Sequence, residues 1–195
     1  MTPRFLICLF LALATAKAFA ADSPGLQNTT ILIIRHAEKP ASGNTLTPAG
    51  EKRAQAYIQY FQNFTVDSQP FKIDTLIAAA NSEGSHRPFL TIEPLGKALG
   101  LPIDQRFNAK EFQKLADDLH AKPHGQHILI CWHHGDIPQL TQALGADTKE
   151  LFKNDKWPDD VFCWVIQLRY DANGKLIDAK RVNEDLMPGD TDHDK

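Results

Sequence analysis

Residues 30–39 read TILIIRHAEK and join an unbroken apolar run to a strongly charged segment. A continuous run of isoleucine, leucine and threonine is typical of a strand buried on both faces, as strands of parallel sheets are. Arg35 and His36 end this run, and a second histidine, His133, follows another apolar run at residues 127–132. Because an arginine beside a histidine is poorly suited to a core, we interpret the two strand ends as parts of an anion site.

The rest of the chain alternates between strand and helix patterns. Further strands are predicted at residues 74–80, 102–107, 127–132, 161–170 and 175–181, the last two forming a hairpin around a turn at 171–174. Helices are predicted at residues 47–61, 87–99, 108–119 and 136–144, with capping signals at Thr47, Gly100, Asn108 and Asp136. This alternation predicts a three-layer α/β/α sandwich with a mostly parallel central sheet and an antiparallel edge hairpin.

Length and composition favour one domain behind a targeting segment. The chain has 195 residues, 43% of them apolar, enough to bury a core without metal or disulfide support. At the start, Arg4 precedes the apolar stretch 5–16, and Ala18-Phe19-Ala20 is a small-x-small cleavage pattern. We therefore expect a signal peptide at 1–20 cut after Ala20, a domain at 21–188 and a frayed polar tail at 189–195. The mature protein is expected to be periplasmic or secreted, without stable membrane insertion.

Charge and cysteine content restrict the partners. Cleavage after Ala20 removes Arg4 and Lys17 from 21 basic residues, so that 19 remain against 24 acidic ones and the net charge is about −5. Such a charge disfavours a nucleic-acid partner. Cys131 and Cys163 lie in apolar strand-like runs, where they are either two buried thiols or a disulfide that an oxidising compartment permits. The sequence does not specify the oligomeric state.

Three strand ends deliver cationic or imidazole groups to one place. Ligands of open α/β sheets collect outside the carboxyl ends of the strands, where Arg35-His36, Arg87 and His133-His134 are expected to meet. A neutral imidazole attacks a phosphate monoester without the repulsion that an anionic nucleophile meets, and forms a phosphoramidate that water hydrolyses. Two guanidinium groups and a second imidazole supply hydrogen-bond donors to the phosphoryl oxygens.

Four motifs, in order along the chain, resemble the histidine phosphatase superfamily, which includes phosphoglycerate mutases and acid phosphatases. Residues 35–38 (RHAE) resemble its Arg-His-Gly-Glu motif, and residues 46–50 (LTPAG) resemble its Leu-Thr-x-x-Gly helix start. Ser82 and Thr91 flank Arg87 as in the family's serine, arginine and threonine run. Residues 128–138 are similar to the strand that carries the second catalytic histidine. The resemblance covers essentially all of the expected mature chain.

The resemblance implies a phosphoglycerate mutase-like fold and a phosphomonoesterase, which the signal peptide would export. Neither a cofactor nor a metal is expected. It implies that His36 is the nucleophile and that Arg35, Arg87 and His133 bind the phosphoryl group of a small phosphorylated substrate. Asn44 is a further phosphate-binding candidate, although it lies farther along the chain from His36 than in the family pattern. His134 either faces the ligand or is a structural polar residue.

The chain departs from the family pattern in three ways. Ala37 replaces the glycine after the nucleophile, which matters only if that residue needs a positive φ. Lys39-Pro40 replaces the usual polar pair and adds a cation. The proton donor is not evident: Glu111 and Asp136 are candidates that helix capping explains equally well, and Glu83 is a third candidate that fits a solvated loop.

Three alternative functions remain open. A mutase needs a second phosphate-binding patch and usually an insertion over the site, which the short loops disfavour. A catalytically weak phosphoryl-ligand-binding protein would explain the missing acid. A metal-binding protein is suggested by the eight histidines, but residues 127 and 133 lie roughly 20 Å apart along a strand. His133 and His134 would also point to opposite faces if both were in that strand. The substrate is not specified.

Overall fold

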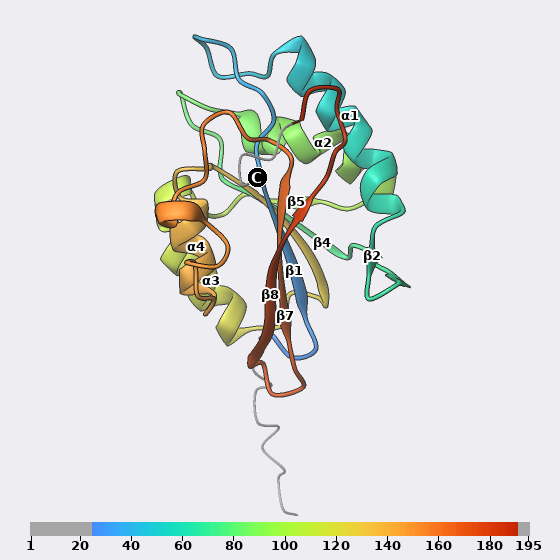
Figure 1. Ribbon diagram of the computed structural model, residues 1–195, viewed down its shortest axis with the longest axis vertical. Helices are drawn as coiled ribbons and strands as arrows, with labels where there is room; N and C mark the ends of the chain where they lie inside the picture. Colours follow the sequence, from blue (N-terminus) through green and yellow to red (C-terminus); the bar gives the residue numbers. More distant parts are fainter. Residues whose placement is uncertain (1–24, 191–195) are drawn as a thin grey trace, which may run out of the picture.

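The computed structural model describes residues 25–190 (Figure 1). The predicted signal peptide at 1–20 and residues 191–195 of the predicted tail lie outside the described residues. Among the residues that are described, no helix combines the length and the apolar character that a membrane crossing needs.

Within residues 25–190, one six-stranded sheet forms the centre of the molecule, in the order β5-β4-β6-β1-β7-β8. The first four strands of that order are parallel, β7 is antiparallel to β1, and β8 is antiparallel to β7. The predicted sheet, with its antiparallel edge hairpin, is confirmed. The strands are β1 (Thr30–Arg35), β4 (Thr75–Ala78), β5 (Ile103–Asp104), β6 (His127–Trp132), β7 (Trp164–Tyr170) and β8 (Leu176–Asn183).

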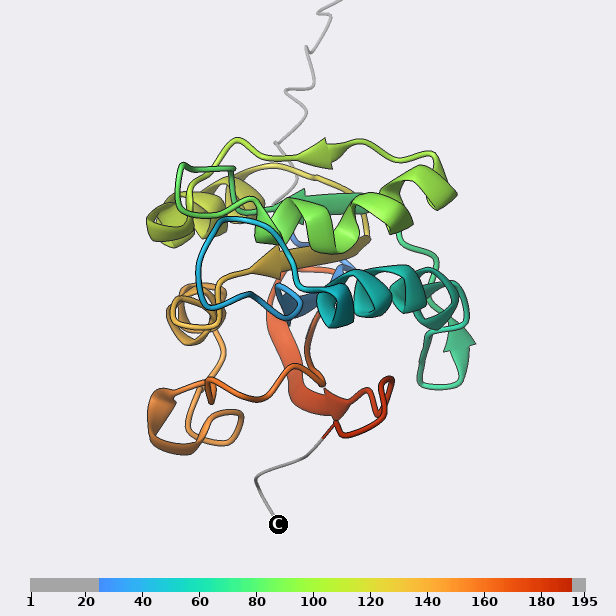
Figure 2. The same cartoon turned by 90° about the horizontal axis from the view of Figure 1, so that it is seen from above.

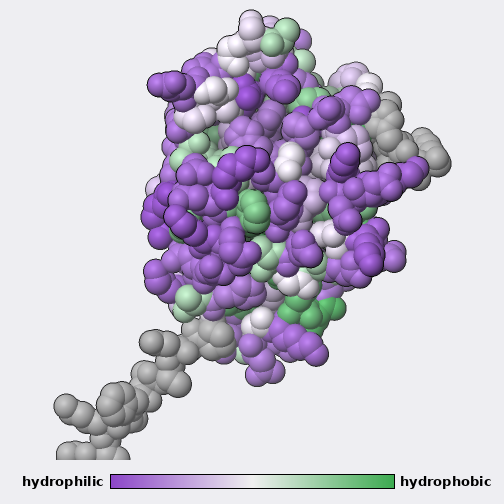
Figure 3. All heavy atoms as spheres, turned by 90° about the vertical axis from the view of Figure 1, so that its left-hand side faces the viewer, coloured by the Kyte–Doolittle hydropathy of each residue, from purple (hydrophilic) through white to green (hydrophobic). Residues whose placement is uncertain are grey.

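Helices cover both faces of the sheet, which makes the three layers visible in Figures 1 and 2. α1 (Pro48–Gln62) and α2 (Arg87–Leu99) pack on one face, where Tyr57 and Phe61 join the apolar side chains of β1 and β4. α3 (Phe112–Ala121) and α4 (Ile137–Ala143) pack on the other, around Trp132 and Trp164. Figure 3 shows that the outer side of the α3–α4 layer is largely hydrophilic. Each helix therefore buries one apolar stripe against the sheet.

Local capping signals place the helix ends where they were expected. The Thr47 hydroxyl accepts from the Gly50 amide at 3.1 Å, and Pro48 begins α1. α2 ends at Gly100, whose φ of 68° is the left-handed conformation that glycine adopts without a steric cost. Asn108 and Glu111 form a reciprocal capping box before α3, through a short 3₁₀ turn η1 (Ala109–Glu111). Asp136 precedes α4, but its side chain does not cap it and bonds elsewhere.

Several boundaries differ from the predictions. β5 covers two of the six residues predicted at 102–107, and β7 begins at Trp164, three residues after the predicted start. A small hairpin of β2 (Thr65–Val66) and β3 (Gln69–Pro70) was not predicted, nor was the 3₁₀ turn η2 (Lys153–Asp155). These elements are two or three residues long, too short to produce a periodic pattern. The predicted tail is not frayed at its start, because Arg53 donates to the Asp190 carboxylate at 2.5 and 3.0 Å.

Cys131 and Cys163 are free thiols in this structure. Cys131 lies in the apolar cluster beneath α1 and α2, whereas Cys163 lies in the cluster beneath α3 and α4. Of the two expectations, buried thiols therefore hold and the disulfide does not. Burial raises the pKa of Cys131 well above its ordinary value and that of Cys163 to about 11, which keeps both as unreactive thiols.

Candidate active site

The carboxyl ends of β1, β4 and β6 bring the predicted residues together, at the end of the sheet seen in Figure 2. The ring centroids of His36 and His133 are 5.2 Å apart, and those of His36 and His134 are 6.3 Å apart. His133 and His134 do not lie in the strand, which was the condition for their pointing to opposite faces. β6 ends at Trp132, so the two histidines lie in the following turn, where strand alternation no longer applies.

His36 is a buried, neutral imidazole with one nitrogen available for reaction. Its side chain is 1% exposed, and Nδ1 lies 2.7 Å from the carbonyl oxygen of Ala37. A carbonyl only accepts, so this bond assigns the proton to Nδ1 and leaves Nε2 with a free lone pair. Burial is the largest cause of a pKa for His36 of about 2, and the neighbouring Arg35, His133 and Arg87 also lower it. The hydrogen bond to Ala37 acts in the opposite direction. His36 is therefore neutral at any moderate pH.

The residue after His36 connects β1 to α2. The Ala37 amide donates to Thr91 Oγ1 at 2.9 Å, and the Thr91 hydroxyl donates to the carbonyl of Arg87 at 2.8 Å. Ala37 does not have a positive φ, so alanine replaces the family's glycine without backbone strain. The Thr91 hydroxyl thereby ties the first residue of α2, which bears one cation of the site, to the segment that bears His36.

Arg35 is held from several sides by neutral groups. Its Nη1 donates to the carbonyls of Pro158, Asp159 and Val161 at 3.1, 3.0 and 2.7 Å. Its guanidinium carbon lies 3.8 Å from the ring centroid of Phe162. Its Nε is buried and has no partner within the described residues. Burial lowers the pKa of Arg35 to about 10, which still leaves it charged at neutral pH. We call residues 158–162 the arginine strap.

His134 links Arg35 to the arginine strap. The Asp159 carboxylate accepts from His134 Nε2 at 2.7 Å, and Arg35 Nη2 lies 3.4 Å from His134 Nδ1. Because arginine only donates and a carboxylate only accepts, these contacts select the neutral tautomer with its proton on Nε2. Burial and Arg35 lower the pKa of His134, in agreement with that assignment. Both ring nitrogens are thus occupied, so His134 has a structural role at Arg35.

Arg87 and the loop between β1 and α1 form a second part of the site. Arg87 Nη1 donates to the carbonyl of Gly43 at 3.0 Å, and its Nε is buried without a partner in the described part of the chain. The amide of Asn44 donates to the carbonyl of Glu83 at 3.4 Å, which joins the first loop to the loop before α2. Burial lowers the pKa of His133 to about 4, with Arg87 adding to the effect and Asp136 opposing it. The site thus combines two arginines with two neutral imidazoles.

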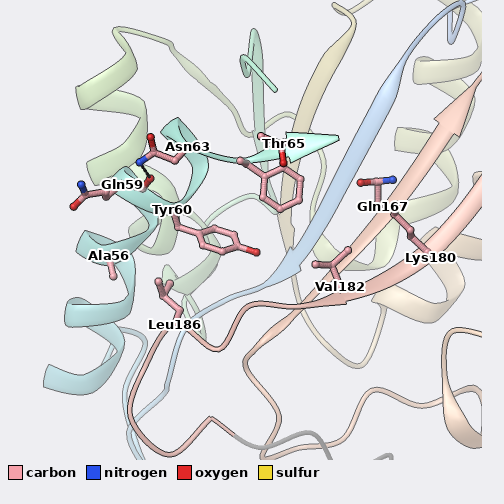
Figure 4. Close-up of a pocket in the computed structure, with 10 residues that line it drawn as sticks. Ala56, Gln59, Tyr60, Asn63, Thr65, Gln167, Lys180, Val182 and Leu186 are labelled. Atoms are coloured by element: carbon pink, nitrogen blue, oxygen red, sulfur yellow. Dashed lines mark hydrogen bonds between the residues drawn. The ribbon is translucent and has the colours of Figure 1, made fainter. Parts of the chain in front are cut away.

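A cavity of about 590 Å³ adjoins this site, between the turn at residues 134–139 and the segment 154–159. A larger cavity of about 730 Å³ lies between α1 and β8, and none of the site residues lines it. Figure 4 shows Tyr60 and Leu186 on one side of it and Gln167, Lys180 and Val182 on the other. We assign the candidate chemistry to the end of the sheet beside the smaller cavity, because His134, which contacts Arg35 and lies near His36, lines that cavity. Residues 25–190 contain no cluster of three metal-ligating side chains.

Comparison with known proteins places this geometry in a known fold. No protein-family model and no curated protein matches the sequence. Among solved structures, phosphoglycerate mutase from Plasmodium falciparum has a TM-score of 0.51 at 18% identity, over 76% of this chain and 87% of that one. The candidate phosphohistidine phosphatase SixA from Agrobacterium tumefaciens has a TM-score of 0.51 at 19% identity, over 78% and 97%. The chain has the fold of these two structures, which is a phosphoglycerate mutase-like fold.

Within this fold, the three candidate proton donors differ in their surroundings. Glu111 accepts from the Asn108 amide and from Lys114 Nζ, and these two bonds lower its pKa. Glu83 is exposed in the loop before α2. Asp136 is buried, and its Oδ1 lies 2.6 Å from Lys110 Nζ. Asp136 also acts on the pKa of His133, so it is the candidate in electrostatic contact with the site.

Sequence reasoning did not find the groups that orient Arg35. These groups are in the arginine strap, where the carbonyls of Pro158 and Asp159 accept from Arg35. Phe162 and Asp159 carry no motif, and their contacts with Arg35 and His134 cross more than twenty residues of chain. The sequence gives one weak sign of this segment: Trp157-Pro158 interrupts the strand pattern before β7 and indicates a loop there.

Proposed function

We propose that this protein is a phosphomonoesterase that works through a phosphohistidine on His36. The observation that carries the proposal is a buried cation with no carboxylate in direct contact, beside a neutral nucleophile. Within the described residues, no carboxylate lies within ion-pair distance of Arg35, whose Nε–H has no acceptor. A buried charge needs a compensating partner, and a phosphoryl group supplies it. His36 Nε2 offers the lone pair that phosphoryl transfer needs.

The proposed reaction has two steps. His36 Nε2 attacks phosphorus, the N–P bond forms, and the O–P bond to the alcohol breaks. Water then attacks the phosphoramidate, the N–P bond breaks, and inorganic phosphate leaves. The Nε–H groups of Arg35 and Arg87 and one N–H of His133 bind the non-bridging oxygens, which gain charge as the reaction proceeds. The Ala37 carbonyl keeps the His36 proton on Nδ1 throughout.

We propose Asp136 as the group that handles the proton of the leaving alcohol. It is buried at the turn that carries His133, whereas Glu111 is held by its capping bonds and Glu83 is exposed. Lys110 at 2.6 Å competes for the Asp136 carboxylate, so protonation of the leaving group is assisted weakly. We expect substrates with good leaving groups, such as aryl phosphates, to react fastest. An Asp136→Asn variant should lose activity on alkyl phosphates more than on aryl phosphates.

A second candidate substrate is a phosphorylated histidine. Weak assistance from Asp136 favours this substrate. The leaving imidazole can carry a proton on its own second nitrogen, so it depends less on an acid of the protein. The fold neighbour from Agrobacterium tumefaciens is named for this activity. The following experiment separates hydrolysis from the alternative of a phosphoryl-ligand-binding protein.

The test has two measurements. The first is hydrolysis of p-nitrophenyl phosphate, and the second is trapping of the phosphorylated protein by quenching during turnover without acid. We expect release of inorganic phosphate and a phosphorylated protein that loses its label in acid, as phosphoramidates do. His36→Asn should abolish both signals, and His120→Asn, an exposed histidine in α3, should leave them unchanged. A His36→Asn variant as active as the parent contradicts the mechanism. A parent that binds phosphate without hydrolysing any monoester supports the binding protein instead.

We also propose that the protein is exported, on the strength of the pattern at residues 1–20. Expression of the whole chain in a bacterial host should give a periplasmic or extracellular product. Its intact mass should correspond to a chain that begins at Ala21. A full-length product confined to the cytoplasm contradicts this proposal and leaves the phosphatase proposal untouched.

A further inference from the structure

The two edges of the central sheet are built differently. β5 at one edge has two residues, which offers little backbone for another strand to pair with. β8 at the other edge has eight residues, and in residues 25–190 no strand lies beyond it. Figure 1 looks onto this edge and shows β8 in front of the sheet. A long edge strand is a template for strand addition unless its side chains prevent it.

The centre of β8 carries two opposite charges around a small residue. Asp178 and Lys180 lie on the same face, because they are opposite Arg169 and Gln167 of β7, and Ala179 lies between them. Arg169, next to Asp178, is paired with Asp67 of the β2–β3 hairpin at 2.6 Å. Neither Asp178 nor Lys180 has an ion pair within the described residues. A lysine on an edge strand ordinarily opposes pairing with another strand. Here an aspartate two residues away can form an ion pair with the lysine of a second copy.

We propose that two copies of this chain associate through antiparallel pairing of β8, with the twofold axis at Ala179. In that register Asp178 lies opposite Lys180 of the second copy, and the contact occurs twice. A shift of two residues in either direction places like charges opposite each other, and a shift of one residue turns the side chains to the wrong face. The charge pattern of β8 is therefore complementary to itself in one register.

Two further features of β8 fit a second copy. Ala179 at the axis has a side chain small enough for the two strands to approach closely. Ile177, at the irregular end of the pairing between β7 and β8, is 57% exposed and is the exposed large hydrophobic residue of the described chain. The proposed pairing brings it against the second copy. The active-site end of the sheet stays open, so this inference does not depend on the proposed function.

The first test is the molar mass of the full chain in solution, by sedimentation equilibrium over a range of concentrations. We expect a dimer for the parent, and at least a tenfold weaker dimer for Asp178→Lys and for Lys180→Asp, since each creates two like-charge contacts. An equimolar mixture of the two variants should dimerise again, because every contact then joins opposite charges. Lys52→Asp on α1, which is exposed and far along the chain from β8, should not change the mass.

The second test uses oxidation across the axis. Ala179→Cys should form a disulfide between copies, because residues directly opposite in antiparallel strands have the separation that a disulfide needs. Lys180→Cys is the matched control and should not, since it lies opposite residue 178 of the second copy. A parent that is monomeric at its highest soluble concentration overturns the proposal. So does a dimer that survives both single charge changes, or one that mixing the variants fails to restore.

Discussion

Arg35 and Arg53 are both buried, at 1% and 2% exposure, and both lie near the ring of Phe162, yet their partners differ in kind. Arg53 donates to Glu38 at 2.8 Å and to Asp190 at 2.5 Å, with Glu184 at 3.6 Å. Arg35 donates to three backbone carbonyls. Arg53 is thus compensated within the described chain, whereas Arg35 is left to be compensated by an anion.

The pKa values reflect this difference. Burial by itself would lower the pKa of Arg53, but the hydrogen-bonded Asp190 and Glu38 outweigh it and hold the pKa above its ordinary value. Burial lowers the pKa of Arg35 to about 10, because the charge of Asp159 and Glu38 only partly offsets it. The partners of a buried arginine, rather than its burial, therefore distinguish a structural cation from a binding cation.

The largest expected effect is on stability, at Arg53. Arg53→Met leaves Glu38, Glu184 and Asp190 without their shared cation, and should lower the free energy of unfolding by about 3–5 kcal/mol. Urea unfolding at neutral pH measures this. Arg106→Met is the control: Arg106 is exposed and bound to two aspartates, and its loss should cost less than about 1 kcal/mol. Equal losses in the two variants would show that burial of the network does not matter.

Arg35→Met should act on activity instead. We expect kcat/KM for an aryl phosphate to fall by about 10²–10³, the usual cost of a lost transition-state donor. The change in unfolding free energy should be smaller than for Arg53→Met, since no carboxylate loses its partner. Arg35→Lys keeps the charge but loses the fork geometry and should rescue little. A variant with parent-like kcat/KM would remove Arg35 from the phosphoryl site.

Phosphate should stabilise the protein through Arg35. Inorganic phosphate at about 100 times its Kd should raise the free energy of unfolding of the parent by about 2.7 kcal/mol. Arg35→Met should lose this increment at the same concentration, and Arg106→Met should keep it. Thermal unfolding with and without phosphate measures the effect without any turnover. An increment that is equal in Arg35→Met and in the parent would place the anion elsewhere.

The neutral state of His36 predicts a pH dependence of stability. The folded protein binds the His36 proton only near pH 2, whereas the unfolded chain binds it near the ordinary value of 6.5. Stability from this group is therefore complete above about pH 6.5 and falls as the pH falls, by about 2 kcal/mol between pH 7 and pH 5. His36→Asn should show a shallower decline over that range. Parent activity should persist in mildly acidic buffer, because the nucleophile stays neutral.

Phe162 should give the smallest effect. Its ring lies 3.8 Å from the Arg35 guanidinium carbon and 5.9 Å from that of Arg53, and such contacts contribute about 0.5–1 kcal/mol. Phe162→Leu should raise KM severalfold with little change in unfolding free energy, since Arg53 keeps its carboxylates. An effect on stability alone would assign Phe162 to the Arg53 network. Steady-state kinetics and urea unfolding of the same variant separate the two.

Local sequence signals predicted the elements that carry the site. The capping bonds at Thr47, Gly100 and the Asn108–Glu111 box join residues at most four positions apart, so their spacing alone reveals them. The carboxyl end of a buried strand is equally visible, which is why the placement of Arg35, His36 and His133 followed from the apolar runs. Asp136 shows the limit: its position before α4 predicted a cap, but its side chain binds Lys110, 26 residues away in the chain.

By itself, the sequence determined the alternation of strands and helices and the residues at the strand ends, because periodicity and capping act within a few residues. Only the tertiary structure decided which buried arginine has carboxylate partners. Glu38 is three residues from Arg35 in the chain, yet it binds Arg53, while the strap that holds Arg35 comes from residues more than 120 positions away. Packing brings those groups together, and no local pattern encodes it.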